Sequence, residues 1–126
     1  MREIMKLFFL TFAVILLSAC GVKSVTSASV QADIVSVAEY KDYSCKELAL
    51  DALNIQNRIP EISSVIDKKK KDNDAYIATA VVFMPTLAAG IKGNQEEAAQ
   101  LALYKGQLNA IRQAAIMKDC EIVVQN

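Results

Sequence analysis

Cysteines are the residues of this chain best suited to chemistry. There are three of them, Cys20, Cys45 and Cys120, and the chain has no histidine and no tryptophan. Without histidine, the commonest general base and metal ligand is missing. The carboxylates Asp51, Glu61 and Asp74 are of a kind that exposed helix faces carry routinely, and no phosphate-binding loop accompanies them. We therefore expect no enzyme, no catalytic residue, no metal site and no cofactor.

Cys20 ends a short apolar run. Arg2 and Lys6 form a basic start, residues 7–17 are almost entirely apolar, and Leu17-Ser18-Ala19-Cys20 follows. This order is typical of a secretory signal, and the run is about half the ~20 residues that a spanning helix needs. The motif resembles the lipobox of bacterial lipoprotein signal peptides. The resemblance implies cleavage after residue 19, a diacylglyceryl group on the Cys20 thiol and acylation of the new amino terminus.

The resemblance also implies a place in the cell. Several acyl chains together attach a protein stably to a membrane. Gly21 is not the aspartate that keeps lipoproteins at the inner membrane of enteric bacteria, so we expect the periplasmic face of the outer membrane, with the inner membrane as the alternative. The alternative to lipidation is an ordinary secreted protein that is cut near Ala19.

The mature chain is nearly neutral and long enough for one small domain. The 14 basic and 14 acidic residues of the whole chain balance, and few of them belong to the signal. No overall field would attract nucleic acid. In an oxidising compartment Cys45 and Cys120 should form a disulfide, which would close a loop of about 75 residues and add roughly 4–5 kcal/mol of stability. The functional alternative is a redox pair or a metal site, which the wide separation of the two cysteines and the lack of histidine disfavour.

The first stretch of the mature chain, residues 20–43, is predicted to be a lipid-anchored tether. It is rich in serine, valine and alanine and has no helical period. Some alternation within residues 30–37 leaves open a short strand that would pair with residues 122–124. Fully extended, about 20 residues reach roughly 65–70 Å, enough to hold a domain well away from its membrane.

A first helix is predicted over residues 45–70. Ser44 and Glu47 have the spacing of a capping box. One apolar stripe with steps of four and three follows: Leu48, Ala52, Ile55, Ile59, Ile62 and Ile66. Pro60 predicts a kink or a break. The basic run at residues 68–71 favours a solvated helix end, with Asp72 or Asp74 capping the next helix; contact with anionic lipid headgroups is the alternative.

A second helix is predicted over residues 75–91, which carry no charge. Three interpretations compete: a buried central helix, a re-entrant segment that dips into a bilayer, and a true span. The candidate residues for contact with a membrane or partner are Tyr76, Val82, Phe83, Met84 and Leu87.

A third helix is predicted over residues 95–118. Its stripe steps as the first one does: Leu101, Tyr104, Leu108, Ile111 and Ala115. Gly106 should cost about 1 kcal/mol relative to alanine unless another backbone crosses there. Because the disulfide would join the start of the first helix to the end of the third, the two must be antiparallel. The fold class is all-α: a helical hairpin or small three-helix domain over residues 44–120, with a tail at 121–126.

Most of the mature chain looks like a set of small, mostly uncharacterised proteobacterial lipoproteins. The resemblance rests on Tyr40-x-x-Tyr43-Ser44-Cys45, on Asn73-Asp74-Ala75 before the apolar block, and on Leu103-Tyr104-Lys105-Gly106 before Cys120. Trp in place of Met84 and Glu in place of Gln107 are more usual in that group. The resemblance implies a location and paired cysteines, and no activity.

Two classes of function fit these features. The first is a structural or adaptor lipoprotein, which is held to the membrane by its acyl groups and binds an envelope protein through the apolar block and the helix faces. The alternative is a membrane-active protein whose residues 75–91 insert in or bridge a bilayer.

Overall fold

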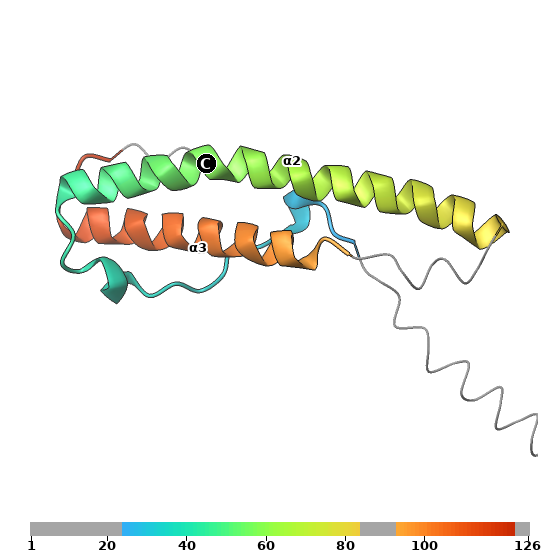
Figure 1. Ribbon diagram of the computed structural model, residues 1–126. Helices are drawn as coiled ribbons and strands as arrows, with labels where there is room; N and C mark the ends of the chain where they lie inside the picture. The colour runs from blue at the N-terminus through green and yellow to red at the C-terminus, as the bar shows by residue number, and fades with distance from the viewer. Residues whose placement is uncertain (1–23, 84–92, 123–126) are drawn as a thin grey trace, which may run out of the picture.

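The structure is a computed structural model that describes residues 24–83 and 93–122, with the side chains of 79–83 left aside. Two long helices dominate it: α2, Cys45–Phe83 with 39 residues, and α3, Gln95–Met117 with 23 residues. They lie antiparallel and side by side (Figure 1). Two short 3₁₀ helices, η1 at Ser27–Ser29 and η2 at Val37–Tyr40, precede them. The described residues contain no strand, which confirms the all-α hairpin.

The end of the hairpin that carries the disulfide, here called the closed end, is fixed by local signals. Cys45 and Cys120 are bonded, with their Cα atoms 5.5 Å apart. The capping box forms as predicted: the Ser44 amide donates to a Glu47 carboxylate oxygen at 2.7 Å, and the Glu47 amide donates to the Ser44 hydroxyl at 3.3 Å. Two orphan amides at the start of α2 are thereby satisfied.

The C-terminus of α3 is closed by a Schellman motif. Asp119 adopts the left-handed conformation, with φ of 52°. The Cys120 amide donates to the Ala115 carbonyl at 2.9 Å, and the Asp119 amide donates to the Ile116 carbonyl at 3.2 Å. This pair of bonds terminates the helix and turns the chain back, so that Cys120 is delivered to Cys45.

The two predicted stripes form the core between the helices. Most of their members are buried, and Ile59 and Tyr104 pack against the buried cluster while partly exposed. The fully buried members are Leu48, Ile66, Leu101 and Ile111. Steps of three and four place these side chains on one face of each helix, and the two faces meet.

The prediction that the first helix ends near residue 70 is wrong. α2 runs without a break through Pro60 and through the charged run, so the predicted break and the separate second helix are absent. Pro60 removes one amide donor, but buried stripe residues on both sides of it hold the helix against α3. The charged run contains neither proline nor glycine, and Lys70 pairs with Asp74 four residues on, which supports a helix interior.

The prediction of an exposed tether also differs from the structure over its described part. Residues 24–44, here called the strap, lie along the hairpin from the far end of α3 to the closed end (Figure 1). Lys105 Nζ donates to the Val30 carbonyl at 2.7 Å, and Tyr40 is buried in the core. The strap contains two 3₁₀ turns and extended backbone, with no strand pairing. Val35 and Val37 pack against the core cluster beside Tyr40, and burial of these side chains offsets the loss of chain entropy.

Gly106 is where the strap crosses α3. The Asp33 amide donates to the Ala102 carbonyl at 2.8 Å, and the Asp33 carbonyl oxygen would lie 2.4 Å from a Cβ atom at position 106. The crossing backbone that could justify a glycine inside the helix is therefore present.

At the other end of the hairpin, here called the open end, α2 is longer than its partner. Residues 74–83, here called the overhang, extend past the start of α3 (Figure 1). Ten helical residues span about 15 Å. The first part of the predicted helix at 75–91 thus exists as a continuation of α2, and residues 84–91 lie outside the described residues.

Candidate functional site

The open end collects the polar contacts that join the strap, α2 and α3. Its centre is Asn94, which precedes α3 and is fully buried. The Asn94 amide nitrogen donates to the Val25 carbonyl at 2.7 Å and to the Ile66 carbonyl at 3.0 Å. Its carbonyl oxygen accepts from the Val25 amide at 2.9 Å. One side chain therefore ties all three segments together, and its burial is compensated by three hydrogen bonds.

Two further contacts attach the first residues of the strap to α2. Asp67 accepts from the Ser27 amide at 2.8 Å and from the Ser27 hydroxyl at 2.6 Å. These bonds stabilise the carboxylate and lower the pKa of Asp67. Asn73 donates to the Ser24 hydroxyl at 3.0 Å. The strap is thus attached to α2 at its first described residue.

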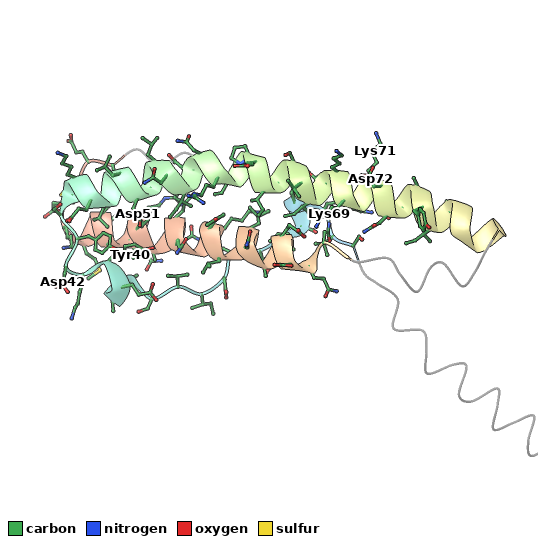
Figure 2. All side chains as sticks on the ribbon, viewed as in Figure 1. Tyr40, Asp42, Asp51, Lys69, Lys71 and Asp72 are labelled. Atoms are coloured by element: carbon green, nitrogen blue, oxygen red, sulfur yellow. A yellow bond between two sulfur atoms is a disulfide. The ribbon has the colours of Figure 1, made fainter. Side chains whose placement is uncertain are left out.

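Ion pairs bracket the same junction. Lys69 reaches across to Glu97 in the first turn of α3, and this hydrogen bond lowers the pKa of Glu97. The second carboxylate oxygen of Glu97 is buried without a partner among the described residues. Lys70 pairs with Asp74 along α2. Lys69 points toward α3, whereas Lys71 and Asp72 lie on the opposite side of α2 (Figure 2).

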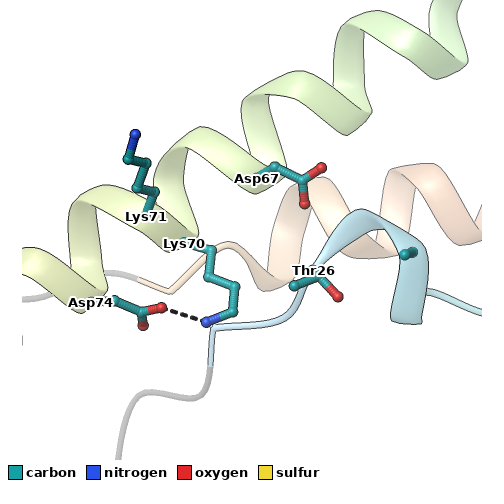
Figure 3. A pocket seen from close by; sticks show the side chains of 6 residues that line it. Thr26, Asp67, Lys70, Lys71 and Asp74 are labelled. Atoms are coloured by element: carbon teal, nitrogen blue, oxygen red, sulfur yellow. Dashed lines mark hydrogen bonds and ion pairs between the residues drawn. The ribbon is translucent and has the colours of Figure 1, made fainter.

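A hollow of about 450 Å³ lies between the strap and α2 at this junction. Figure 3 shows Lys70 and Asp74 paired along the α2 wall of the hollow, with Lys71 directed away. Asp67, on its wall, is bound to Ser27. Lys70 and Asp74 pair with each other, Asp67 is bound to Ser27, and Lys71 points away, so these charges do not converge on a space for a ligand.

The predicted site residues have the following positions. Cys45 and Cys120 form the disulfide, whereas Cys20 lies outside the described residues. Tyr76 is on the overhang and 49% exposed. Val82 and Phe83 are in the last turn of α2. Met84 and Leu87 lie outside the described residues.

The carboxylates considered for catalysis are not brought together. Asp51, Glu61 and Asp74 all lie on α2, separated by about 15 and 20 Å along its axis. Over residues 24–83 and 93–122 no group of three acidic, histidine or cysteine residues could hold a metal ion. No helix within that part of the chain has the length and apolar character to cross a membrane.

The closed end differs in its surface. Apolar side chains are exposed within a few turns of the disulfide, on both helices and on the strap: Tyr43, Leu50, Leu53, Ile116 and Met117. Beneath them Tyr40 packs edge to face on Tyr43, with ring centroids 5.2 Å apart. Burial, together with the charge of Asp51, raises the pKa of Tyr40 to about 12, so this phenol stays neutral.

Asn94 and Asp67 are the site residues that sequence reasoning missed. Asn94 lies just before Glu96 and Glu97 at the start of α3, but its side chain does not cap the helix and instead binds a backbone 69 residues away. Asp67 resembles any solvated helix residue. No local pattern could have found either contact, because each depends on where the strap lies.

Comparison with protein-family models, with curated proteins and with solved structures finds no match.

Proposed function

We propose that this chain is a lipid-anchored envelope lipoprotein with a structural or adaptor role, attached to the membrane through Cys20. The observation that carries the proposal is the position of Ser24 on the open end, bound to Asn73 of α2. Only residues 21–23 separate Ser24 from Cys20, and four residues span at most about 14 Å. An anchor at Cys20 therefore holds the open end, and not the closed end, near the membrane.

The disulfide supports an oxidising compartment such as the periplasm. The exposed apolar side chains near the disulfide, on the outer faces of α2 and α3, are the candidate contact points for a protein partner. In this arrangement the hairpin is a rod: its open end is at the membrane, and its closed end, with Leu50, Leu53, Ile116 and Met117, faces an envelope protein.

Lipidation and partner binding are tested separately. Labelling with a radioactive fatty acid should mark the wild-type protein, and Cys20→Ala should abolish the label and release the protein from the membrane fraction. A photo-crosslinker at Leu53 in intact cells should give a discrete protein adduct, and the same group at the exposed strap residue Ile34 serves as the matched control. An unlabelled protein with its leader attached would contradict the anchor. A monomer without adducts would contradict the adaptor role, and release of vesicle contents by the protein would favour the membrane-active alternative.

A further inference from the structure

Most of the overhang is an uncharged helix that α3 does not cover. It extends beyond the start of α3, Tyr76 and Ala78 are exposed on it, and residues 75–83 carry no charge. A charged belt on α2 covers residues 68–74 and so ends at Asp74, the first residue of the overhang; Lys68 and Lys71 are exposed in it. An uncharged helix end next to exposed lysines is the pattern of a segment that meets a membrane interface, where tyrosine and lysine side chains are favoured.

We infer that the overhang lies against the bilayer that holds the lipidated Cys20, with Tyr76 at the interface, the lysines at the level of the headgroups and the disulfide directed away. The inference rests on the proposed lipidation and adds an orientation and a second membrane contact. The occupant of the overhang is thus a lipid surface, which is favoured over a protein by the nearness of the anchor.

The reach of the anchor carries this orientation. From Asn73, where Ser24 is attached, the overhang extends about 15 Å. The link from Ser24 to Cys20 spans at most about 14 Å. The lipidated residue and the end of the overhang therefore lie within similar distances of the contact between Ser24 and Asn73. From Cys45 to Asn73 the helix is about 42 Å long, so the same link could not allow the closed end to stand on the membrane while the open end points away.

Because the chain has no tryptophan, a single introduced tryptophan reports its own surroundings. We would purify lipidated Tyr76→Trp and reconstitute it in vesicles of phosphatidylethanolamine and phosphatidylglycerol in which some lipids carry bromine on their acyl chains. Leu53→Trp is the matched control, since Leu53 lies on the same helix and its exposure, 53%, is close to that of Tyr76. The two positions are about 34 Å apart.

Tryptophan at position 76 should emit at shorter wavelength than in detergent-free buffer and lose most of its emission to brominated lipid, while tryptophan at position 53 should keep its emission. Equal quenching at both positions would mean that the rod lies flat, and no quenching at position 76 would mean that the overhang avoids lipid. Either result overturns the inference. So would a discrete protein adduct, in place of lipid adducts, from a photo-crosslinker at position 76 in cells.

Failure of the inference is distinguishable from failure of the anchor. Mass spectrometry of the same preparations shows whether Cys20 carries its acyl groups. A lipidated protein that floats with vesicles but is not quenched at position 76 refutes only the contact of the overhang. A protein that lacks the acyl groups refutes the proposed function on which the inference rests. Vesicles without phosphatidylglycerol test whether Lys68 and Lys71 contribute to membrane contact. In these vesicles the quenching at position 76 should be weaker but still detectable.

Discussion

The two ends of the hairpin are held together by different means. At the closed end a covalent bond, a capping box and a Schellman motif act within a few residues of Cys45 and Cys120. Lys118 adds hydrogen bonds to the Lys41 and Tyr43 carbonyls at 2.6 and 2.8 Å. At the open end the contacts join residues that are distant in sequence, through the buried amide of Asn94 and through the ion pair of Lys69 with Glu97.

This difference shows how a small domain can divide its tasks. Exposed ion pairs contribute little, so the open end depends on one buried side chain and on the fit of the strap, whereas the closed end keeps a bond that denaturant cannot break. The end that we place at the membrane is therefore the one that can adjust, and the end that we assign to a partner is rigid. The predictions below test this contrast.

Removing the disulfide should have the largest effect. In Cys45→Ser with Cys120→Ser the unfolded chain regains the freedom of a loop of about 75 residues, and the free energy of unfolding should fall by roughly 4 kcal/mol. Urea unfolding followed by circular dichroism measures this change. Dithiothreitol should lower the stability of the wild type to that of the double variant and leave the variant unchanged. Equal midpoints for oxidised wild type and variant would show that the closed end does not depend on the bond.

Asn94→Leu should have the second largest effect on the free energy of unfolding. The substitution leaves the Val25 amide and carbonyl without their partner in a buried junction, which should cost about 2–3 kcal/mol. Hydrogen exchange should locate the loss at the open end, with protection around Cys45 retained. Asn94→Asp is the matched control of nearly equal shape: it loses the two donors and buries a carboxylate, so its stability should rise as the pH falls and the acid becomes neutral. Uniform loss of protection along both helices would contradict the contrast between the ends.

Gly106→Ala tests the strap by the sign of its effect. In a simple helix, alanine would add about 1 kcal/mol of stability. Here its Cβ atom would meet the Asp33 carbonyl oxygen, so we expect a loss of about 1–3 kcal/mol in thermal or urea unfolding. Gln113→Ala, at an exposed position on the same helix, is the control and should be nearly neutral. A stabilised Gly106→Ala would mean that the strap does not cross α3 at this point.

Acid should destabilise the fold, and two of the three carboxyl groups concerned lie at the open end. Hydrogen bonds lower the pKa of Asp67 and Glu97 at the open end and of Glu47 at the closed end. A carboxyl group whose pKa is lower in the folded state stabilises the fold above its unfolded pKa, and this contribution is lost as the pH falls through the folded pKa. Urea midpoints should therefore fall below about pH 4.5, the ordinary pKa of glutamate. In Asp67→Asn the decline should be shallower, and an unchanged decline would contradict the role of Asp67.

Asp119→Gly should have the smallest effect. Asp119 pays a steric cost at φ of 52°, which glycine avoids, so the variant should gain up to about 1 kcal/mol if the Schellman motif is kept. Differential scanning calorimetry should show a small rise in Tm. Glu121→Gly, two residues further along, lacks this reason and should not raise it. A loss of stability in Asp119→Gly would show that the aspartate side chain, and not the turn alone, holds the closed end.

The sequence predicts this molecule unevenly, and the reason is the range of the interactions. The capping box and both apolar stripes are set by residues three or four apart, and the structure confirms them. The disulfide, which was predicted from an expected oxidising compartment, is also confirmed. For Gly106 the sequence left two outcomes open, a weak point in the helix or a crossing backbone, and the structure shows the crossing. The course of the strap and the buried role of Asn94 depend on contacts across 69 residues, which leave no periodic trace.

The errors along α2 have a related cause. Pro60 and the charged run are ordinary signals for the end of a helix. Buried isoleucines on both sides of Pro60 outweigh the first signal, and the charged run contains neither proline nor glycine to end the helix. Packing against α3 thus outweighed local helix propensity. The sequence predicted only that α3 runs antiparallel to α2, from the expected disulfide. The candidate site at the open end could be predicted in composition, from its lysines and its uncharged residues, but not in its nearness to Ser24.

The course of the strap has a mechanical consequence. Its contacts with Asn94, Asp67, Lys105 and the Ala102 carbonyl follow one another along the hairpin axis. A pulling force on residue 24 along that axis would load these hydrogen bonds in shear, so that several must break together and not one after another. If the chain is anchored through Cys20 as we propose, tension from the membrane would be shared among these contacts and would not fall on any one of them.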